Sequence, residues 1–220
     1  MDWSGEWWVL ILGPGLVILV VGILYFKRSR AFRFRSAAAQ LGFIALEGRN
    51  PITDEEKRRF GLLSRSGGKI TNLFGDRIDS PSKLILDFAA TMGSPPLECN
   101  QTVAAFRVSS DAIPDFQIIP VSMFGRIAPD AGRQAIPFES YPDFRARFRV
   151  YGENEAAIRS FLSSGLLNHL ASSEAGSDCV IEKAGRWFIF YRHNVVIPPD
   201  KLFDSWQQLQ SLASPLLAAR

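Results

Sequence analysis

The sequence contains few residues of the kinds that bind metals or form disulfides. Among its 220 residues there are two cysteines and two histidines. Cys99 and Cys179 are too few for a disulfide framework, and this usage agrees with a reducing compartment. His169 and His193 do not have the spacing of a metal-binding pair. We therefore expect neither a metal site nor a disulfide-stabilised fold, and we expect no cofactor.

Charged side chains are absent between Glu6 and Lys27. The intervening run, residues 7–26, is 20 residues long. At about 1.5 Å rise per residue, a helix of that length spans about 30 Å, the thickness of a hydrocarbon core. Aromatic rings stand near both ends of the run, at the level of lipid headgroups: Trp3, Trp7, Trp8, Tyr25 and Phe26. The sequence predicts a transmembrane helix over residues 7–26.

A cleaved signal peptide is the main alternative for this segment. Such a peptide needs a basic first region and a cleavage site with small residues. The first six residues carry Asp2 and Glu6 and no base, and the apolar run ends in a basic cluster without such a site. We therefore expect the segment to be retained.

Basic residues follow the predicted span and acidic residues precede it. The positive-inside rule then puts residues 1–6 outside the cell and the rest of the chain in the cytoplasm. Bases in this position also favour anionic lipid headgroups. The residues expected to face headgroups are Lys27, Arg28, Arg30, Arg33 and Arg35.

The remainder of the chain is electrically neutral. Residues 1–35 hold five of the 25 bases and two of the 22 acids, which leaves 20 of each. Non-specific nucleic-acid binding needs a basic face, so we expect no nucleic-acid partner.

Residues 27–46 are expected to form a basic juxtamembrane segment, helical to about Leu41 with Gly42 as its cap. Residues 47–220 are long enough for one soluble domain. Strands are predicted near Ile70–Phe74, Leu84–Thr91, Val103–Val108, Phe116–Pro120 and Phe144–Tyr151, and a hairpin near residues 179–192. Helices are predicted near Asp54–Phe60 and Glu153–Leu170 and after Pro198. Strands and helices are grouped rather than alternating, which indicates an α+β fold with a mainly antiparallel sheet and flanking helices.

The segment Phe144–Tyr151 alternates apolar and basic residues. As a strand it places Arg145, Arg147 and Arg149 on one face, about 6.6 Å apart. Such a stripe can bind successive phosphates or acidic side chains. It can equally be a solvated face or a charged, protected sheet edge.

Catalytic residues are hard to find. Cys179, His193 and Asn194 have the types needed for a thiol nucleophile, its base and an orienting group. However, Cys179 begins a predicted strand, and free cysteines are most often core residues. His169 ends a predicted helix, where a histidine interacts favourably with the helix dipole.

Several short stretches together resemble a known family. They are Leu41-Gly42-Phe43 after the basic helix, Asn100–Phe106, Ile113–Phe116, Tyr141–Phe144 and Ile181–Gly185. The chain resembles a family of bacterial single-pass membrane proteins that carry a domain of unknown function. The resemblance implies a bacterial inner membrane and implies no activity, cofactor or catalytic residue.

We expect a membrane-anchored cytoplasmic domain that binds a protein partner or a second copy of itself, as an adaptor or assembly component. One alternative is a module that senses anionic lipid or another anion. A second alternative is a thiol or serine hydrolase. The sequence identifies no small-molecule substrate.

Overall fold

The computed structural model describes residues 30–92, 97–110, 112–123, 134–174 and 176–219. The predicted span, residues 7–26, and the bases Lys27 and Arg28 therefore lie outside the described residues. Among the residues that the structure does describe, no helix is both long enough and apolar enough to cross a membrane.

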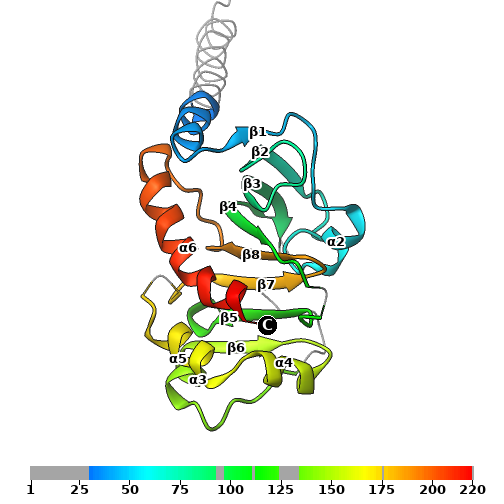
Figure 1. Ribbon diagram of the computed structural model, residues 1–220, viewed down its shortest axis with the longest axis vertical. Coiled ribbons are helices and arrows are strands. Elements are labelled where there is room, and N and C mark those ends of the chain that lie inside the picture. The colour runs from blue at the N-terminus through cyan, green and yellow to red at the C-terminus, as the bar shows by residue number, and fades with distance from the viewer. Residues whose placement is uncertain (1–29, 93–96, 111, 124–133, 175, 220) are drawn as a thin grey trace, which may run out of the picture.

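An eight-stranded antiparallel sheet organises the domain (Figure 1). Its order is β1-β2-β3-β4-β8-β7-β5-β6. The strands are β1 (Ile44–Ala45), β2 (Lys69–Gly75), β3 (Lys83–Met92), β4 (Leu97–Arg107), β5 (Phe116–Pro120), β6 (Phe148–Tyr151), β7 (Val180–Ala184) and β8 (Trp187–Tyr191). All neighbouring strands pair antiparallel, which confirms the predicted α+β fold with an antiparallel sheet.

Helices connect or flank the strands. The described part of the first helix covers residues 30–40. It is followed by α2 (Asp54–Arg59), η1 (Val121–Met123), α3 (Pro142–Arg147), α4 (Glu155–Phe161), α5 (Ser164–Ser172), η2 (Pro199–Lys201) and α6 (Leu202–Ala218). The predicted helix Glu153–Leu170 is thus two helices, divided at Leu162 and Ser163.

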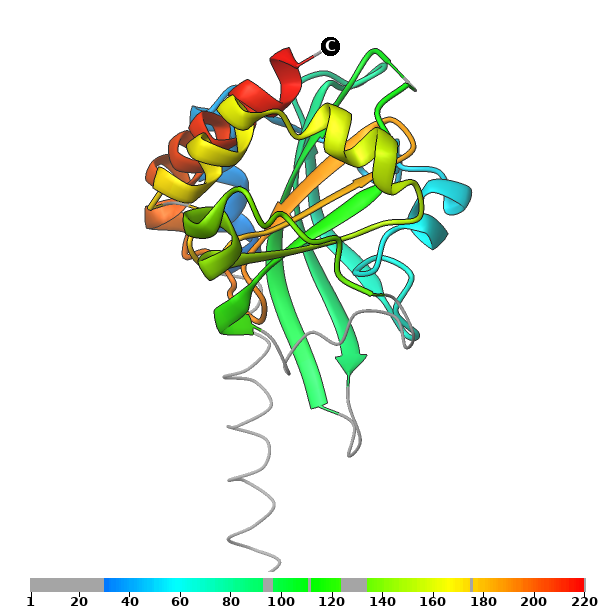
Figure 2. The same ribbon diagram turned by 90° about the horizontal axis from the view of Figure 1, so that it is seen from below.

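The sheet separates two apolar clusters. The larger cluster lies under the first helix, α5 and α6, and the smaller lies under α2 and the loop that follows it. Figure 2 shows the first helix, α5 and α6 on one side of the sheet and α2 on the other. Trp206 of α6 joins the larger cluster by stacking on Phe106 at 5.1 Å between ring centroids and by contacting Phe43 edge-on at 4.9 Å.

Local signals explain several boundaries. Thr53 caps α2 by accepting a hydrogen bond from the Glu56 amide, while the Glu56 side chain accepts one from the Thr53 amide, so the pair forms a capping box. Gly42, at φ +80°, ends the first helix as predicted, because its amide and that of Phe43 turn back to the carbonyls of Ala39 and Ala38.

One strand prediction is wrong. Residues 144–147 belong to helix α3, and only Phe148–Tyr151 form a strand. Pro142 occupies the first turn of α3, where a proline is favoured. Phe144 and Phe148 are four residues apart, so their burial suits a helical face as well as a strand face.

Candidate functional site

The first helix is bonded to the sheet through one ion pair. Arg30 Nη2 lies 3.1 Å from Asp87 Oδ2 of β3. The other terminal nitrogen, Nη1, donates to the Ile197 carbonyl oxygen at 3.1 Å, in the segment before α6. Both side chains are largely shielded, 20% exposed for Arg30 and 12% for Asp87. Arg30 therefore points toward the sheet rather than outward.

Asp87 joins three further parts of the fold. Its carboxylate also accepts hydrogen bonds from Asn72 Nδ2 at 2.9 Å and from the Thr102 hydroxyl at 2.6 Å. The Thr102 oxygen in turn accepts from the Ile197 amide at 2.9 Å. One carboxylate thus links the first helix, β2, β4 and the segment leading to α6. A partly buried charge with this many donors is strongly held.

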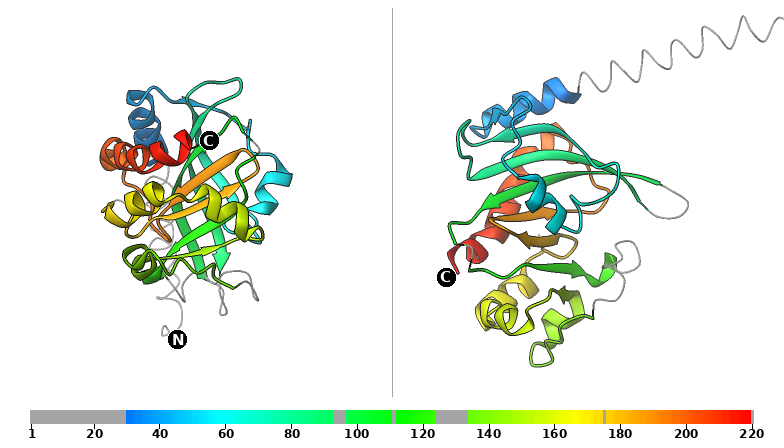
Figure 3. Two further views of the ribbon diagram at one scale, coloured as in Figure 1. Left: turned by 60° about the horizontal axis from the view of Figure 1, so that its bottom comes forward. Right: turned by 90° about the vertical axis from the view of Figure 1, so that its right-hand side faces the viewer.

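A groove opens between the first helix and β2, next to this network. We call it the helix–strand groove; it has a volume of about 600 Å³, within the size range of ligand clefts. Its lining comes from the first helix, the turn around β1, and β2: Ala31, Phe32, Arg35, Ala45, Glu47, Gly48, Asn50, Ile70, Thr71, Asn72, Leu73 and Phe74. In the right-hand view of Figure 3 the first helix lies beside β1 and β2, at one end of the domain.

Exposed side chains surround the groove. Phe32 is 74% exposed, and Ile44 in the neighbouring strand β1 is 46% exposed. Arg35 Nη2 lies 3.2 Å from Glu47 Oε1, with the two side chains 63% and 76% exposed. An ion pair this open to water contributes about 0–1 kcal/mol to stability. The groove therefore combines apolar walls with Arg35, an arginine whose ion pair with Glu47 is weak.

Strand β1 protects only part of β2. It pairs with Phe74 and Gly75, and the Leu46 amide bonds to the Leu73 carbonyl oxygen. Along Lys69–Asn72 no strand among the described residues pairs with the outer edge of β2. Asn72, at φ +49°, lies in a β-bulge between Thr71 and Phe74. This bulge and the exposed Lys69 both disfavour the addition of another strand at this edge of the sheet.

The predicted arginine stripe does not form. Arg145 and Arg147 lie on α3 and Arg149 lies on β6. Arg147 donates to the carbonyl oxygens of Ala171 and Ser173, at 3.0 Å for the latter, and so ties α3 to the end of α5. Arg149 donates to the Phe148 and Arg145 carbonyl oxygens. Of the three, Arg145 is exposed, whereas Arg147 and Arg149 are half-buried.

The juxtamembrane bases also differ from one another. Arg33 and Arg35 are exposed, whereas Arg30 is bonded to Asp87. That Lys27, Arg28, Arg30, Arg33 and Arg35 face headgroups remains a prediction, and the geometry favours Arg33 and Arg35 for it.

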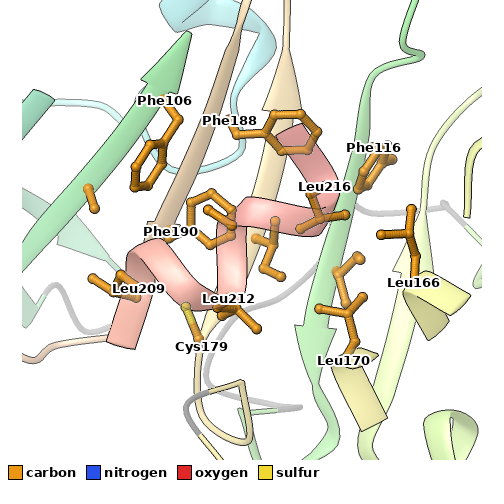
Figure 4. Close-up of a cluster of buried hydrophobic side chains, with 14 of the residues drawn as sticks. Phe106, Phe116, Leu166, Leu170, Cys179, Phe188, Phe190, Leu209, Leu212 and Leu216 are labelled. Atoms are coloured by element: carbon orange, nitrogen blue, oxygen red, sulfur yellow. The ribbon is translucent and has the colours of Figure 1, made fainter. Parts of the chain in front are cut away.

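Cys179 has the environment of a core residue. It is fully buried, and Figure 4 shows it within the apolar cluster of the sheet, α5 and α6. Burial raises the pKa of its thiol to about 12, so the thiolate needed for nucleophilic attack does not form at neutral pH. His193 and Asn194 lie in the turn after β8, with Asn194 exposed. His169 lies in the last turn of α5, as predicted.

Two buried charges in the β7–β8 hairpin were not singled out from the sequence. Glu182 accepts four hydrogen bonds: from the amides of Gly61 (2.6 Å) and Leu62 (3.3 Å), from Gln117 Nε2 (3.1 Å) and from the Tyr191 hydroxyl (2.7 Å). Lys183 donates to the carbonyl oxygens of Ile113 and Gly185. Consecutive charges in a strand whose neighbours are all apolar are the signal that would have indicated buried partners.

Glu182 fastens the loop after α2 onto the sheet. Burial raises the pKa of Glu182, and the hydrogen bonds from Tyr191, Leu62, Gly61 and Gln117 oppose that rise. Burial also holds the pKa of Tyr191 well above its usual value, so its hydroxyl stays protonated and donates. The hydrogen bonds of Glu182 join the loop after α2 to strands β5 and β8, and we therefore assign Glu182 and its partners a structural role.

Comparison with known proteins adds a likeness in fold. No family model matches the chain, and no curated protein matches it at a significant level. The domain is similar to the crystal structure of the mycobacterial trehalose monomycolate transport factor A, TtfA, with a TM-score of 0.58 and 12% sequence identity. The match covers 88% of this chain and 97% of that one. At this identity the match establishes that the two proteins share a fold.

Proposed function

We propose that the chain is a membrane-anchored accessory factor, without catalytic chemistry of its own, that binds a protein partner in machinery moving lipid at a bacterial inner membrane. The observation that carries the proposal is the likeness to TtfA, because it covers 88% of this chain and 97% of that protein's. TtfA is a trehalose monomycolate transport factor, and this role suggests the setting. In this proposal the domain acts by binding a partner through its surface and does not use a set of catalytic residues.

The anchor in this proposal is the apolar run over residues 7–26. With the basic residues after it, it places the domain on the cytoplasmic side. Arg30 supports a rigid anchor, because its bonds to Asp87 and Ile197 fix the start of the described helix to the sheet. A domain held in this way presents the same surfaces to a neighbouring membrane protein at all times.

Three exposed residues on different parts of the surface are available for contact with a partner. Phe32 borders the helix–strand groove, Phe203 on α6 is 55% exposed, and Arg145 is the exposed member of the predicted arginine surface. Large exposed aromatic side chains are common in interfaces, and arginine is enriched there as well.

Site-specific photo-crosslinking in intact membranes tests the proposal. A photoreactive residue replaces Phe32, Phe203 or Arg145 in the full-length chain, and captured proteins are identified by mass spectrometry. Glu55, exposed in the first turn of α2, serves as the control position. A reproducible crosslink to another membrane protein from one position supports the proposal. Crosslinks only between copies of the chain, or none at any position, contradict the assignment of a separate protein partner.

A further inference from the structure

The helix–strand groove lies close to where the predicted span ends. Phe26 is the last apolar residue of the run, and the described helix begins at residue 30. Phe32 follows Phe26 by six positions, and six residues reach at most about 21 Å even when fully extended. The headgroup layer extends about 5–8 Å beyond each side of the hydrocarbon core. With residues 7–26 in the membrane, as proposed, Phe32 at the mouth of the groove is therefore held within about 21 Å of the hydrocarbon core, close to the headgroup layer.

The lining of the groove suits an amphiphile. Apolar side chains from three elements form its walls, among them Phe32 of the first helix, Ala45 of β1 and Ile70 of β2. Arg35 and Glu47 also belong to the lining, and their charged groups contact each other at 3.2 Å. A hydrocarbon chain gains about 0.8 kcal/mol for each methylene buried, and a guanidinium binds phosphate with two parallel hydrogen bonds.

The Arg35–Glu47 ion pair is exposed to solvent, so another anion can reach Arg35. Both side chains are more than half exposed, and a single contact of 3.2 Å joins them. Glu47 itself has a positive φ of +31°, followed by Gly48 at +83°, in a turn closed by the Arg49 amide on the Leu46 carbonyl oxygen. The contact with Glu47 uses one of the five N–H donors of the Arg35 guanidinium, and the turn keeps the Glu47 carboxylate beside it, so Glu47 competes with a phosphate for Arg35.

We propose that the helix–strand groove binds an anionic phospholipid from the adjacent leaflet, with an acyl chain against Phe32, Ile70 and Phe74 and the headgroup phosphate on Arg35. The inference rests on the membrane anchor in the proposed function and adds a lipid site to it. An extended peptide pairing with the outer edge of β2 is the competing occupant. The bulge at Asn72 and the exposed Lys69 oppose strand addition there, whereas they do not hinder a hydrocarbon chain.

The test uses the full-length chain in lipid nanodiscs without other proteins. The probe is phosphatidylglycerol with a photoreactive diazirine on its acyl chain, compared with phosphatidylcholine carrying the same group. Labelled peptides are mapped by mass spectrometry. The proposal predicts labelling of residues 31–35 and 70–74 by the phosphatidylglycerol probe, about fivefold above the phosphatidylcholine probe, the difference expected from one base near a lipid surface.

Variants of the exposed pair give opposite results. Arg35→Gln lowers groove labelling about fivefold, because the phosphate loses its partner, while Glu47→Gln raises it by releasing Arg35. Arg58→Gln, which removes an exposed base on α2, leaves labelling unchanged. Labelling of residues 1–29 alone, equal labelling by both lipids, or no response to the two variants overturns the proposal. If residues 1–29 are not labelled either, the anchor itself fails, whereas the absence of a protein partner in cells does not affect this experiment.

Discussion

Asp87 Oδ2 lies 3.1 Å from Arg30 Nη2, which joins the strand β3 to the helix that follows the predicted span. The same carboxylate also accepts from Asn72 and Thr102. Arg30 and Asp87 are 57 positions apart in sequence. This contact ties the start of the described part of the first helix to the sheet.

Replacing Asp87 is expected to destabilise the domain more than replacing Arg30. Asp87→Ala leaves Arg30, Asn72 and Thr102 without their shared acceptor, and the loss of one partner of a buried pair costs about 3–5 kcal/mol. Arg30→Ala leaves Asp87 with two donors, so the loss is expected to be smaller. Thermal unfolding of the full-length chain in detergent measures both.

Glu139→Gln is the matched control for these variants, because Glu139 is an exposed carboxylate. Its unfolding free energy is expected to change by no more than about 0.5 kcal/mol, as for most surface substitutions. An Asp87→Ala chain as stable as this control would show that the network contributes nothing to the fold.

Glu182 is expected to control the loop after α2. Glu182→Ala removes the acceptor of the Gly61 and Leu62 amides, which the carboxylate holds at 2.6 and 3.3 Å. Hydrogen exchange of these two amides should accelerate, since they become free to open locally. Exchange in α6, on the other face of the sheet, should be less affected. Unchanged protection at both amides would refute the role given to Glu182.

The raised pKa of Glu182 gives a pH dependence with a defined sign. Because its pKa is higher in the folded than in the unfolded state, proton binding favours folding. As pH falls toward 4.5, the ordinary pKa of a glutamate side chain, the native chain should gain stability relative to Glu182→Gln. Unfolding free energies of the two proteins across this range measure the difference. A relative loss of stability on acidification would reverse the assignment.

Cys179 is expected to be inert in the native protein. Its pKa of about 12 and its burial keep it as a protected thiol at pH 8. In a Cys99→Ala background, a thiol-reactive probe should label the chain only after unfolding. Rapid, stoichiometric labelling of the native chain would instead support the thiol-hydrolase alternative.

Much of the fold could be predicted from local patterns. Strand β5 has the predicted bounds, Phe116–Pro120. The hairpin of β7 and β8 was indicated by apolar runs on either side of Ala184-Gly185, and Gly185 does adopt a positive φ of +54°. In both cases the signal is contained in a few consecutive residues, so tertiary contacts did not need to be known.

The segment Phe144–Tyr151 shows where a local pattern fails. Apolar residues at Phe144, Phe148 and Val150 satisfy the strand period, and the first two also satisfy the helix spacing of four. The bonds from Arg147 to the end of α5 help to hold α3 in place. They join residues 24 and 26 positions apart, and no local pattern contains them.

The helix–strand groove could not be predicted for a similar reason. Its walls come from three segments, the first helix, the turn near β1, and β2, which only the sheet order brings together. Asp87 did carry a signal, because an acid between Leu86 and Phe88 in an apolar strand needs buried partners. The identity of those partners depends on tertiary structure.

Membrane anchoring with a cytoplasmic domain is the central claim, and protease protection tests it most directly. A tag at the C-terminus of the full-length chain is exposed to protease in spheroplasts and in inverted inner-membrane vesicles, and carbonate washing tests retention in the membrane. The account predicts retention after the wash, protection in spheroplasts and digestion in inverted vesicles. Release by carbonate, or digestion in spheroplasts, would contradict it.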